Sequence, residues 1–192
     1  MILISINPFA LKRFFFVILA LIGLSCISAY GDSLLMSVNS TPYDRQMSRI
    51  RPILSSGSQD DRTDVSLRMV NHWIGDLRSI PYGFTREWKT PAETQSGSPA
   101  DCKAKAVALY ERMKEHGARN VRLVIGRRTS SSRSTHAWVE WETDGADYVL
   151  DPTINWMAYR SNDLGTRSYI PSYAFAGNRK YRAASATLLA QN

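Results

Sequence analysis

The chain has 192 residues, of which 44% are hydrophobic and 21% charged, and its formal net charge at pH 7 is +7. This composition excludes a disordered or low-complexity protein, and the length suits one packed domain with a short additional segment. The Lys and Arg side chains are scattered rather than gathered in one helix or an aromatic-basic stripe, so we expect no nucleic-acid partner.

The first 31 residues have the pattern of a signal peptide. Lys12 and Arg13 precede an apolar run at 14–27, and Ala29-Tyr30-Gly31 offers a small-x-small cleavage site. The run is shorter than the roughly 20 residues that cross a bilayer, so we expect a periplasmic or secreted protein with no stable membrane span after cleavage. An uncleaved N-terminal anchor is the alternative. Cleavage leaves Cys102 without another cysteine, and a lone thiol in an exported protein is inert, intermolecular or reactive.

Residues 32–59 contain Ser, Pro and Gly with few apolar side chains, which predicts a flexible leader. The packed domain is expected at 60–192. It opens with an amphipathic helix that starts near Asp64 and ends before Pro81, because apolar residues recur there at helical spacing. The aromatic stretch that follows, at 81–97, is expected to be an ordered loop packed against the domain.

A second helix is predicted at 99–116. Ser98 is a suitable cap residue, and Pro99 suits the first helical position. Cys102 shares the apolar face of this helix with Ala106 and Leu109, so its side chain is expected to point inward. A thiol near a helix N-terminus has its thiolate form favoured by the helix dipole.

Strand patterns dominate the chain after residue 119. Strands are expected at 120–126, 135–142 and 148–151, with one or two more in the aromatic tail at 163–182. An Asp144-Gly145 turn closes a hairpin between the second and third of them. With a two- or four-residue loop, Asp151 lies opposite Trp138 and on the same sheet face as His136. A bulge or a three-residue loop would shift the register by one and separate them.

Cys102, His136 and Asp151 together predict a cysteine hydrolase. The thiol attacks, the imidazole takes and returns a proton, and the carboxylate orients the imidazole. The backbone N–H of Cys102 is one oxyanion donor, and Gln95 or Trp88 is a candidate for the second. Taken singly, each of the three also suits an ordinary structural role, as a packed thiol, a hydrogen-bonded strand histidine or a turn cap. The three histidines are scattered, and the sequence has no Gly-rich phosphate loop. We therefore expect no metal site and no cofactor.

The motifs around these residues resemble those of bacterial transglutaminase-like cysteine proteinases. The resemblance extends over about residues 60–181 and rests on Asp101-Cys102, Thr135-His136-Ala137-Trp138 and Leu150-Asp151-Pro152-Thr153, with Trp88, Pro91 and Glu93 upstream. It implies an α+β fold of the papain-like/transglutaminase-like type, in which the catalytic helix packs on an antiparallel sheet. It also implies periplasmic hydrolysis of peptide bonds, in some relatives those of large surface adhesins. Relatives that need calcium carry acidic residues directly after the cysteine, where this chain has Lys103 and Ala104.

Three functions remain open from the sequence. The first is an exported cysteine peptidase that acts on a protein or peptide such as a cell-surface protein. The second is an amidase or acyltransferase of the same fold that acts on cell-wall peptides or amines. The third is a non-catalytic binding domain that holds an acidic partner in a basic groove near Arg127, Arg128 and Arg133.

Overall fold

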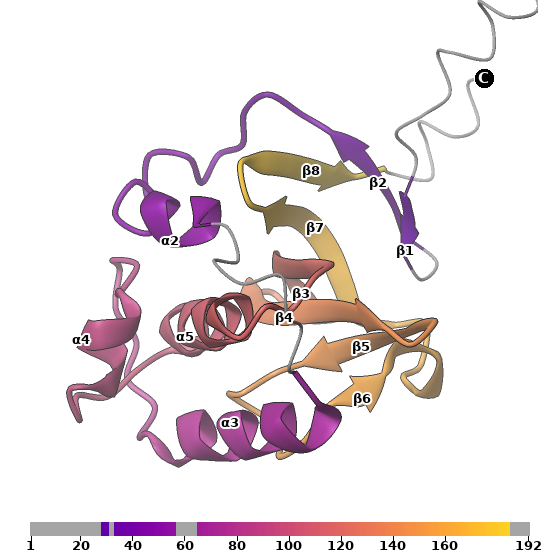
Figure 1. Ribbon diagram of the computed structural model, residues 1–192. Helices are drawn as coiled ribbons and strands as arrows, with labels where there is room; N and C mark the ends of the chain where they lie inside the picture. Colours follow the sequence, from indigo (N-terminus) through magenta and orange to yellow (C-terminus); the bar gives the residue numbers. More distant parts are fainter. Residues whose placement is uncertain (1–27, 31–32, 57–64, 185–192) are drawn as a thin grey trace, which may run out of the picture.

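A computed structural model describes residues 28–30, 33–56 and 65–184, which form one eight-stranded antiparallel sheet with helices packed against it (Figure 1). The strand order is β1-β2-β8-β7-β3-β4-β5-β6. The strands are β1 (Ser28–Tyr30), β2 (Ser33–Ser37), β3 (Val121–Thr129), β4 (His136–Thr143), β5 (Ala146–Leu150), β6 (Tyr159–Arg160), β7 (Ser168–Ala176) and β8 (Arg179–Ala183). The helices are α2 (Arg51–Ser55), α3 (Leu67–Ser79), α4 (Pro91–Gln95), α5 (Cys102–Glu115) and the 3₁₀ turn η1 (Ser161–Asp163).

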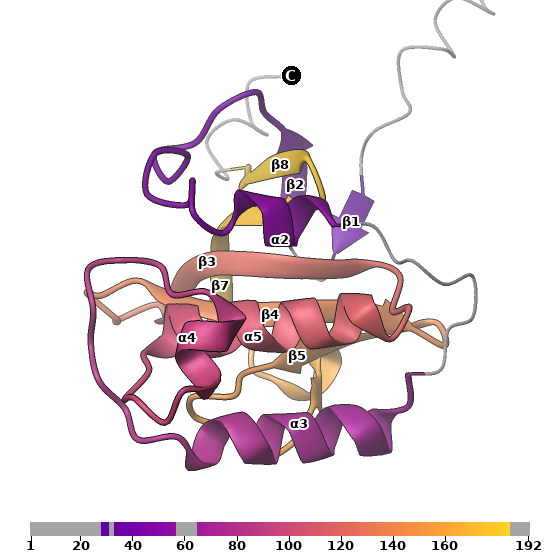
Figure 2. The same cartoon turned by 60° about the vertical axis from the view of Figure 1, so that its left-hand side comes forward.

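The main hydrophobic core lies between one face of the sheet and the helices α2, α3 and α5 (Figures 1 and 2). Because side chains alternate along a strand, Leu123 and Val139 point into this core while Val124 and Trp138 belong to a smaller cluster on the other face. Burying one such large apolar side chain contributes about 1.5–3 kcal/mol. No helix in the described ranges is long and apolar enough to cross a bilayer.

Helix α5 begins at Cys102 instead of the expected Pro99. Asp101 is its N-cap, since the Asp101 carboxylate accepts a hydrogen bond from the backbone N–H of Ala104 at 3.1 Å. Cys102 is therefore the first helical residue, closer to the positive end of the helix dipole than the sequence predicted. The polar face of α5 is less exposed than expected, because Lys105 is buried and donates its ammonium to the carbonyl of Ile80 at 2.6 Å.

Helices α3 and α4 depart from expectation at their starts. α3 begins at Leu67, where the side chain of Ser66 caps the helix, rather than near Asp64. The stretch expected to be loop at 81–97 contains the short helix α4, which follows a capping box between Thr90 and Glu93. The Thr-x-x-Glu pattern that marks this helix was present in the sequence.

The predicted hairpin is confirmed in type and register. Asp144 and Gly145 both have positive φ angles, 51° and 69°, as a two-residue type I′ turn requires. Glu142 pairs with Asp147, and Val139 pairs with Leu150, so the next position beyond Leu150 lies opposite Trp138. The aromatic tail supplies both of the additional strands that the sequence allowed, β7 and β8.

Residues 33–56 belong to the packed domain, which corrects the prediction of a flexible leader at 32–59. Strand β2 pairs with β8, and Leu35, Met47, Ile50 and Leu54 are buried. The low average hydrophobicity of this segment led to the prediction of a leader, but its few large apolar side chains are buried in the domain. Of the expected signal peptide, the structure describes Ser28–Tyr30, which form β1 beside β2; the rest of 1–31 lies outside the described residues.

Candidate active site

A cavity of about 580 Å³ lies where the first turn of α5 meets the start of β4. Its lining residues come chiefly from the loop at 81–90, the α5 N-terminus and the β3–β4 connection. Cys102 and His136 both line this cavity. The structure thus brings together at one end of the sheet two residues that are far apart in the sequence.

The His136 imidazole and the Asp151 carboxylate form a hydrogen bond, with 2.7 Å between Nε2 and Oδ2. The β4–β5 hairpin places them, since His136 is the first residue of β4 and Asp151 directly follows β5. Asp151 is completely buried, and the His136 side chain is 12% exposed. Because Nε2 is bonded to Asp151, Nδ1 is the ring nitrogen left for the thiol.

Asp151 has two further hydrogen-bond donors. The backbone N–H of Thr153 donates to Oδ1 at 3.0 Å, and the Tyr169 hydroxyl donates to Oδ2 at 2.9 Å. Burial by itself raises the Asp151 pKa, but the bond and charge of His136, with the donors Thr153 and Tyr169, hold that pKa below its ordinary value. The carboxylate is therefore charged across the neutral range.

The sequence analysis missed Tyr169. It lies at the start of β7 in the left-handed region, with φ of 50°, and its hydroxyl also accepts a hydrogen bond from the Asn155 side chain at 3.1 Å. A left-handed backbone is costly for an aromatic residue and persists where surrounding contacts hold it. Only an aromatic residue in a strand-like tail was visible in the sequence, because the pairing of β7 with β3 is a long-range event.

The His136 pKa is shifted to about 9. Burial acts to lower it, but the hydrogen bond and charge of Asp151, together with the nearby Cys102 sulfur, outweigh burial and raise it. His136 is consequently an imidazolium at neutral pH. An imidazolium beside a thiol favours the thiolate, which is the nucleophilic form.

Trp138 forms the floor beneath His136. The two rings are stacked with centroids 6.2 Å apart, and the Trp138 indole N–H donates to buried Glu140 at 3.1 Å. Gly126 pairs with His136 across the sheet, and a Cβ at Gly126 would lie 2.1 Å from the Ile170 carbonyl and 2.7 Å from the Trp138 ring. A glycine is therefore required at this position of β3, because β7 and the Trp138 ring approach its backbone this closely.

Asp101 fastens the cavity wall to the helix that carries Cys102. Its buried carboxylate accepts the backbone N–H of Thr85 at 3.2 Å and the ammonium of Lys103. Lys103 also donates to the Thr85 carbonyl at 2.9 Å and lies over the Phe84 ring at 5.1 Å. The start of α5 and the loop at 81–90 are thus held as one unit.

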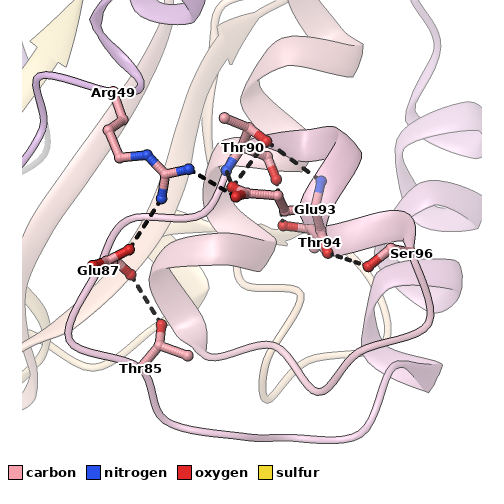
Figure 3. A network of polar contacts seen from close by, with 7 residues as sticks. All are labelled: Arg49, Thr85, Glu87, Thr90, Glu93, Thr94 and Ser96. Carbon is pink, nitrogen blue, oxygen red and sulfur yellow. Dashed lines mark hydrogen bonds and ion pairs between the residues drawn. The ribbon is translucent and has the colours of Figure 1, made fainter.

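Arg49 also holds this loop, through ion pairs with two glutamates (Figure 3). Its guanidinium bonds Glu87 at 3.2 Å and Glu93 at 2.7 Å, while Glu93 also closes the capping box with Thr90. Arg49 belongs to the segment that was expected to be loosely held. That segment instead supports a wall of the cavity.

The two predicted oxyanion residues lie in different places. Trp88 lines the cavity and is 1% exposed, and its indole N–H is buried without a hydrogen-bond partner among the described residues. Gln95 is the last residue of α4, is exposed, and is not among the residues that line the cavity. The structure therefore brings Trp88, and not Gln95, to the cavity of Cys102.

No cluster of three or more His, Cys, Asp or Glu side chains that could hold a metal ion occurs within 28–30, 33–56 and 65–184. The Asp101 carboxylate next to Cys102 is instead paired with the Lys103 ammonium. The cavity lining offers a thiol, an imidazolium and an unpartnered indole N–H, and the imidazolium is hydrogen-bonded to the buried Asp151 carboxylate.

The fold is of the mixed class in which helices pack on an antiparallel sheet. Solved structures with a similar fold include Legionella pneumophila LapG. The EGTA-treated form is 12% identical with a TM-score of 0.54, covering 76% of this chain and 80% of that chain. The calcium-bound form is 12% identical with a TM-score of 0.52, covering 77% and 85%. At this identity the likeness is one of fold. No protein-family model and no curated protein matches the sequence.

Proposed function

We propose that the chain is a cysteine peptidase in which Cys102 is the nucleophile, His136 its acid–base partner and Asp151 the residue that orients His136. The observation that carries the proposal is the hydrogen bond between His136 and buried Asp151 beside a cavity that Cys102 and His136 both line. A packed thiol with no catalytic role does not require a charged imidazole beside it.

The mechanism follows from these positions. The Cys102 thiolate attacks the scissile carbonyl carbon, and the negative charge moves to the carbonyl oxygen. The backbone N–H of Cys102, unpaired at the first helical position, and the orphaned Trp88 indole N–H are the donors for that oxyanion. His136 then gives its Nδ1 proton to the leaving amine, which leaves a thioester on Cys102.

The second half of the reaction reverses the proton movement. Neutral His136 takes a proton from water, the hydroxide attacks the thioester carbonyl, and the thiolate leaves as the acid product is released. Asp151 keeps the same ring orientation in both halves, and its bonds to Thr153 and Tyr169 keep Asp151 in place. An amine in place of water gives acyl transfer from the same thioester, so the acceptor must be determined by experiment.

The resemblance to bacterial transglutaminase-like cysteine proteinases supports a protein or peptide substrate, such as a cell-surface protein. The signal-peptide pattern supports action in the periplasm or outside the cell. A cavity of about 580 Å³ is of the size in which small-ligand and peptide segments bind.

Calcium does not fit this site, although one LapG structure is calcium-bound. Calcium needs six to eight oxygen ligands, supplied chiefly by carboxylates and carbonyls. Here Asp101 is taken by Thr85, Ala104 and the Lys103 ammonium, and a lysine beside the cysteine repels a cation. We therefore assign no step to a metal.

The test is digestion of a complex peptide mixture by the purified protein, with new termini identified by mass spectrometry. Wild type is expected to create cleavage products that Cys102→Ala and His136→Ala do not. Adding a tagged primary amine separates the acceptors, because acyl transfer labels the products and hydrolysis does not. Identical product patterns from wild type and Cys102→Ala would refute the peptidase assignment.

A further inference from the structure

The charges around the cavity are of one sign. Its lining contains the cations Arg86, Lys103 and Arg128 and contains no Asp or Glu. His136, also in the lining, adds the positive charge of its imidazolium. A substrate bound there meets positive charge from the loop at 81–90, from the start of α5 and from the β3–β4 region.

Two of these three cations have no ion-pair partner among the described residues. Lys103 is neutralised by Asp101, and the acidic residue on the same loop, Glu87, is bonded to Arg49 (Figure 3). Arg86 and Arg128 have neither an ion pair nor a hydrogen bond with any residue in the described part of the chain. Both are exposed, so their guanidinium groups are accessible to a ligand.

The two arginines line the same cavity from two separate segments of the chain. Arg86 is in the loop at 81–90, and Arg128 is near the end of β3, where its charge acts on Tyr169, the partner of Asp151. Unpaired charge in a cleft attracts ligands of the opposite sign more strongly than on an open surface, because the protein walls focus the field. Guanidinium groups favour carboxylates in particular, through two parallel hydrogen bonds.

We propose that Arg86 and Arg128 form a carboxylate-binding subsite, and that the cleft selects peptides carrying a carboxylate close to the scissile bond. This inference rests on the proposed peptidase function and adds a substrate class to it. The carboxylate comes from an acidic side chain or from a peptide C-terminus, and protection experiments with short peptides distinguish these two sources.

A matched pair of alkylating reagents tests the subsite without a known substrate. Iodoacetate and iodoacetamide have nearly the same size and differ in charge. Their rates at Cys102 in the full chain are followed by mass spectrometry of the Cys102 peptide, at low ionic strength. Replacing Arg128 or Arg86 by Gln is expected to lower the iodoacetate-to-iodoacetamide ratio by about tenfold for a lost charge-assisted contact. His136 is present in every variant, so its charge affects the iodoacetate-to-iodoacetamide ratio equally in all of them.

Arg133→Gln is the matched control, since Arg133 is an exposed arginine in the neighbouring loop that does not line the cavity. A ratio that is unchanged in both Arg86→Gln and Arg128→Gln, or lowered as much by Arg133→Gln, overturns the subsite. That outcome leaves the proposed function standing if Cys102 still reacts rapidly with iodoacetamide. A Cys102 that reacts with neither reagent removes the proposed function itself.

Short peptides then identify the source of the carboxylate, by protecting Cys102 against iodoacetamide. The set is a blocked tripeptide with a central Glu, the same peptide with Gln, and an all-Ala tripeptide with a free C-terminus. Protection by the Glu peptide assigns the subsite to an acidic side chain, and protection by the free C-terminus assigns it to the chain end. Equal protection by all three, or protection that persists in Arg128→Gln, contradicts the proposal.

Discussion

Asp151 carries a full charge in a completely buried position, which is tolerated only because its oxygens are fully hydrogen-bonded. Its three donors are the His136 imidazole, the Thr153 backbone N–H and the Tyr169 hydroxyl. A buried carboxylate without partners would lose several kcal/mol on leaving water. The same bonds that offset this cost also fix the orientation of the His136 ring.

Replacing Asp151 by Asn tests this coupling. The His136 pKa, about 9 in the native protein, is expected to fall toward its ordinary value of 6.5, because the carboxylate that stabilises the imidazolium is gone. The measurement is an NMR titration of the His136 ring. Asp163→Asn, the same change at an exposed site, is the control and leaves the titration in place. A His136 titration unmoved by Asp151→Asn would contradict the coupling.

Glu140 supplies a pH dependence of stability. Burial raises its pKa from 4.5 to about 7, against the Trp138 hydrogen bond and the charge of Arg122, with Asp147 also acting to raise it. The folded state therefore holds the proton more tightly than the unfolded state. The stabilisation that the protonated Glu140 carboxyl gives the folded state is fully present below pH 4.5. It is lost as pH rises through 7, which lowers the free energy of unfolding by about 3 kcal/mol in all.

The variant Glu140→Gln keeps an acceptor for the Trp138 indole N–H and removes the titrating proton. We expect the free energy of unfolding to become nearly independent of pH between about 4.5 and 7, as measured by urea denaturation at several pH values. Glu142→Gln, an exposed change on the same hairpin, is the control and retains the wild-type slope. A slope that persists in Glu140→Gln would assign it to another group.

Among the helices and strands, the sequence predicted those features that depend on neighbouring residues, such as the hairpin between β4 and β5. The Asp144-Gly145 turn determines the register of β4 and β5, and this register places His136 and Asp151 on one face. The start of α5 was misplaced because Ser98-Pro99 and Asp101 are both acceptable helix starts. The side chain of Asp101 decides between them by capping Ala104.

Elements that depend on distant partners were not predictable in the same way. Tyr169 reaches Asp151 because β7 pairs with β3, and Arg49 reaches Glu87 because residues 33–56 pack beside α5 and β7. Neither pairing leaves a local signal in the sequence. Tertiary packing therefore adds residues around the candidate site that local patterns could not indicate.

Ile50→Ala tests whether the segment at 33–56 is part of the cooperative domain. Ile50 is fully buried, so its truncation is expected to lower the free energy of unfolding by roughly 2–5 kcal/mol. Chemical denaturation measures the change, with exposed Ser48→Ala as the control. A loss below about 0.5 kcal/mol, the usual size of a surface substitution, would restore the flexible-leader hypothesis.

At the scale of the molecule, segments from the whole described chain meet at one end of the sheet. The α5 N-terminus, the start of β4 and the start of β7 converge there, and the loop at 81–90 is fastened to the α5 N-terminus. Internal ion pairs hold this arrangement, with Lys103 on Asp101 and Arg49 on Glu87 and Glu93.

Calcium removal is accordingly expected to have no effect. The rate of Cys102 alkylation and the melting temperature should be the same after treatment with EGTA and after addition of excess calcium, because the Lys103 ammonium already neutralises Asp101. Magnesium addition controls for ionic strength. A rate or melting temperature that falls with EGTA and returns with calcium would show that the protein binds calcium and would contradict this expectation.

The central claim is that His136 activates Cys102, and the pH dependence of Cys102 alkylation by iodoacetamide tests it most directly. The full chain and its His136→Ala variant are compared with N-acetylcysteine, since an ordinary thiol ionises near pH 8.5. We predict that native Cys102 reacts much faster than N-acetylcysteine at pH 6, and that His136→Ala abolishes this advantage. A Cys102 that is unreactive at pH 6, or equally reactive without His136, would contradict the catalytic assignment and leave a binding domain on an enzyme-like fold.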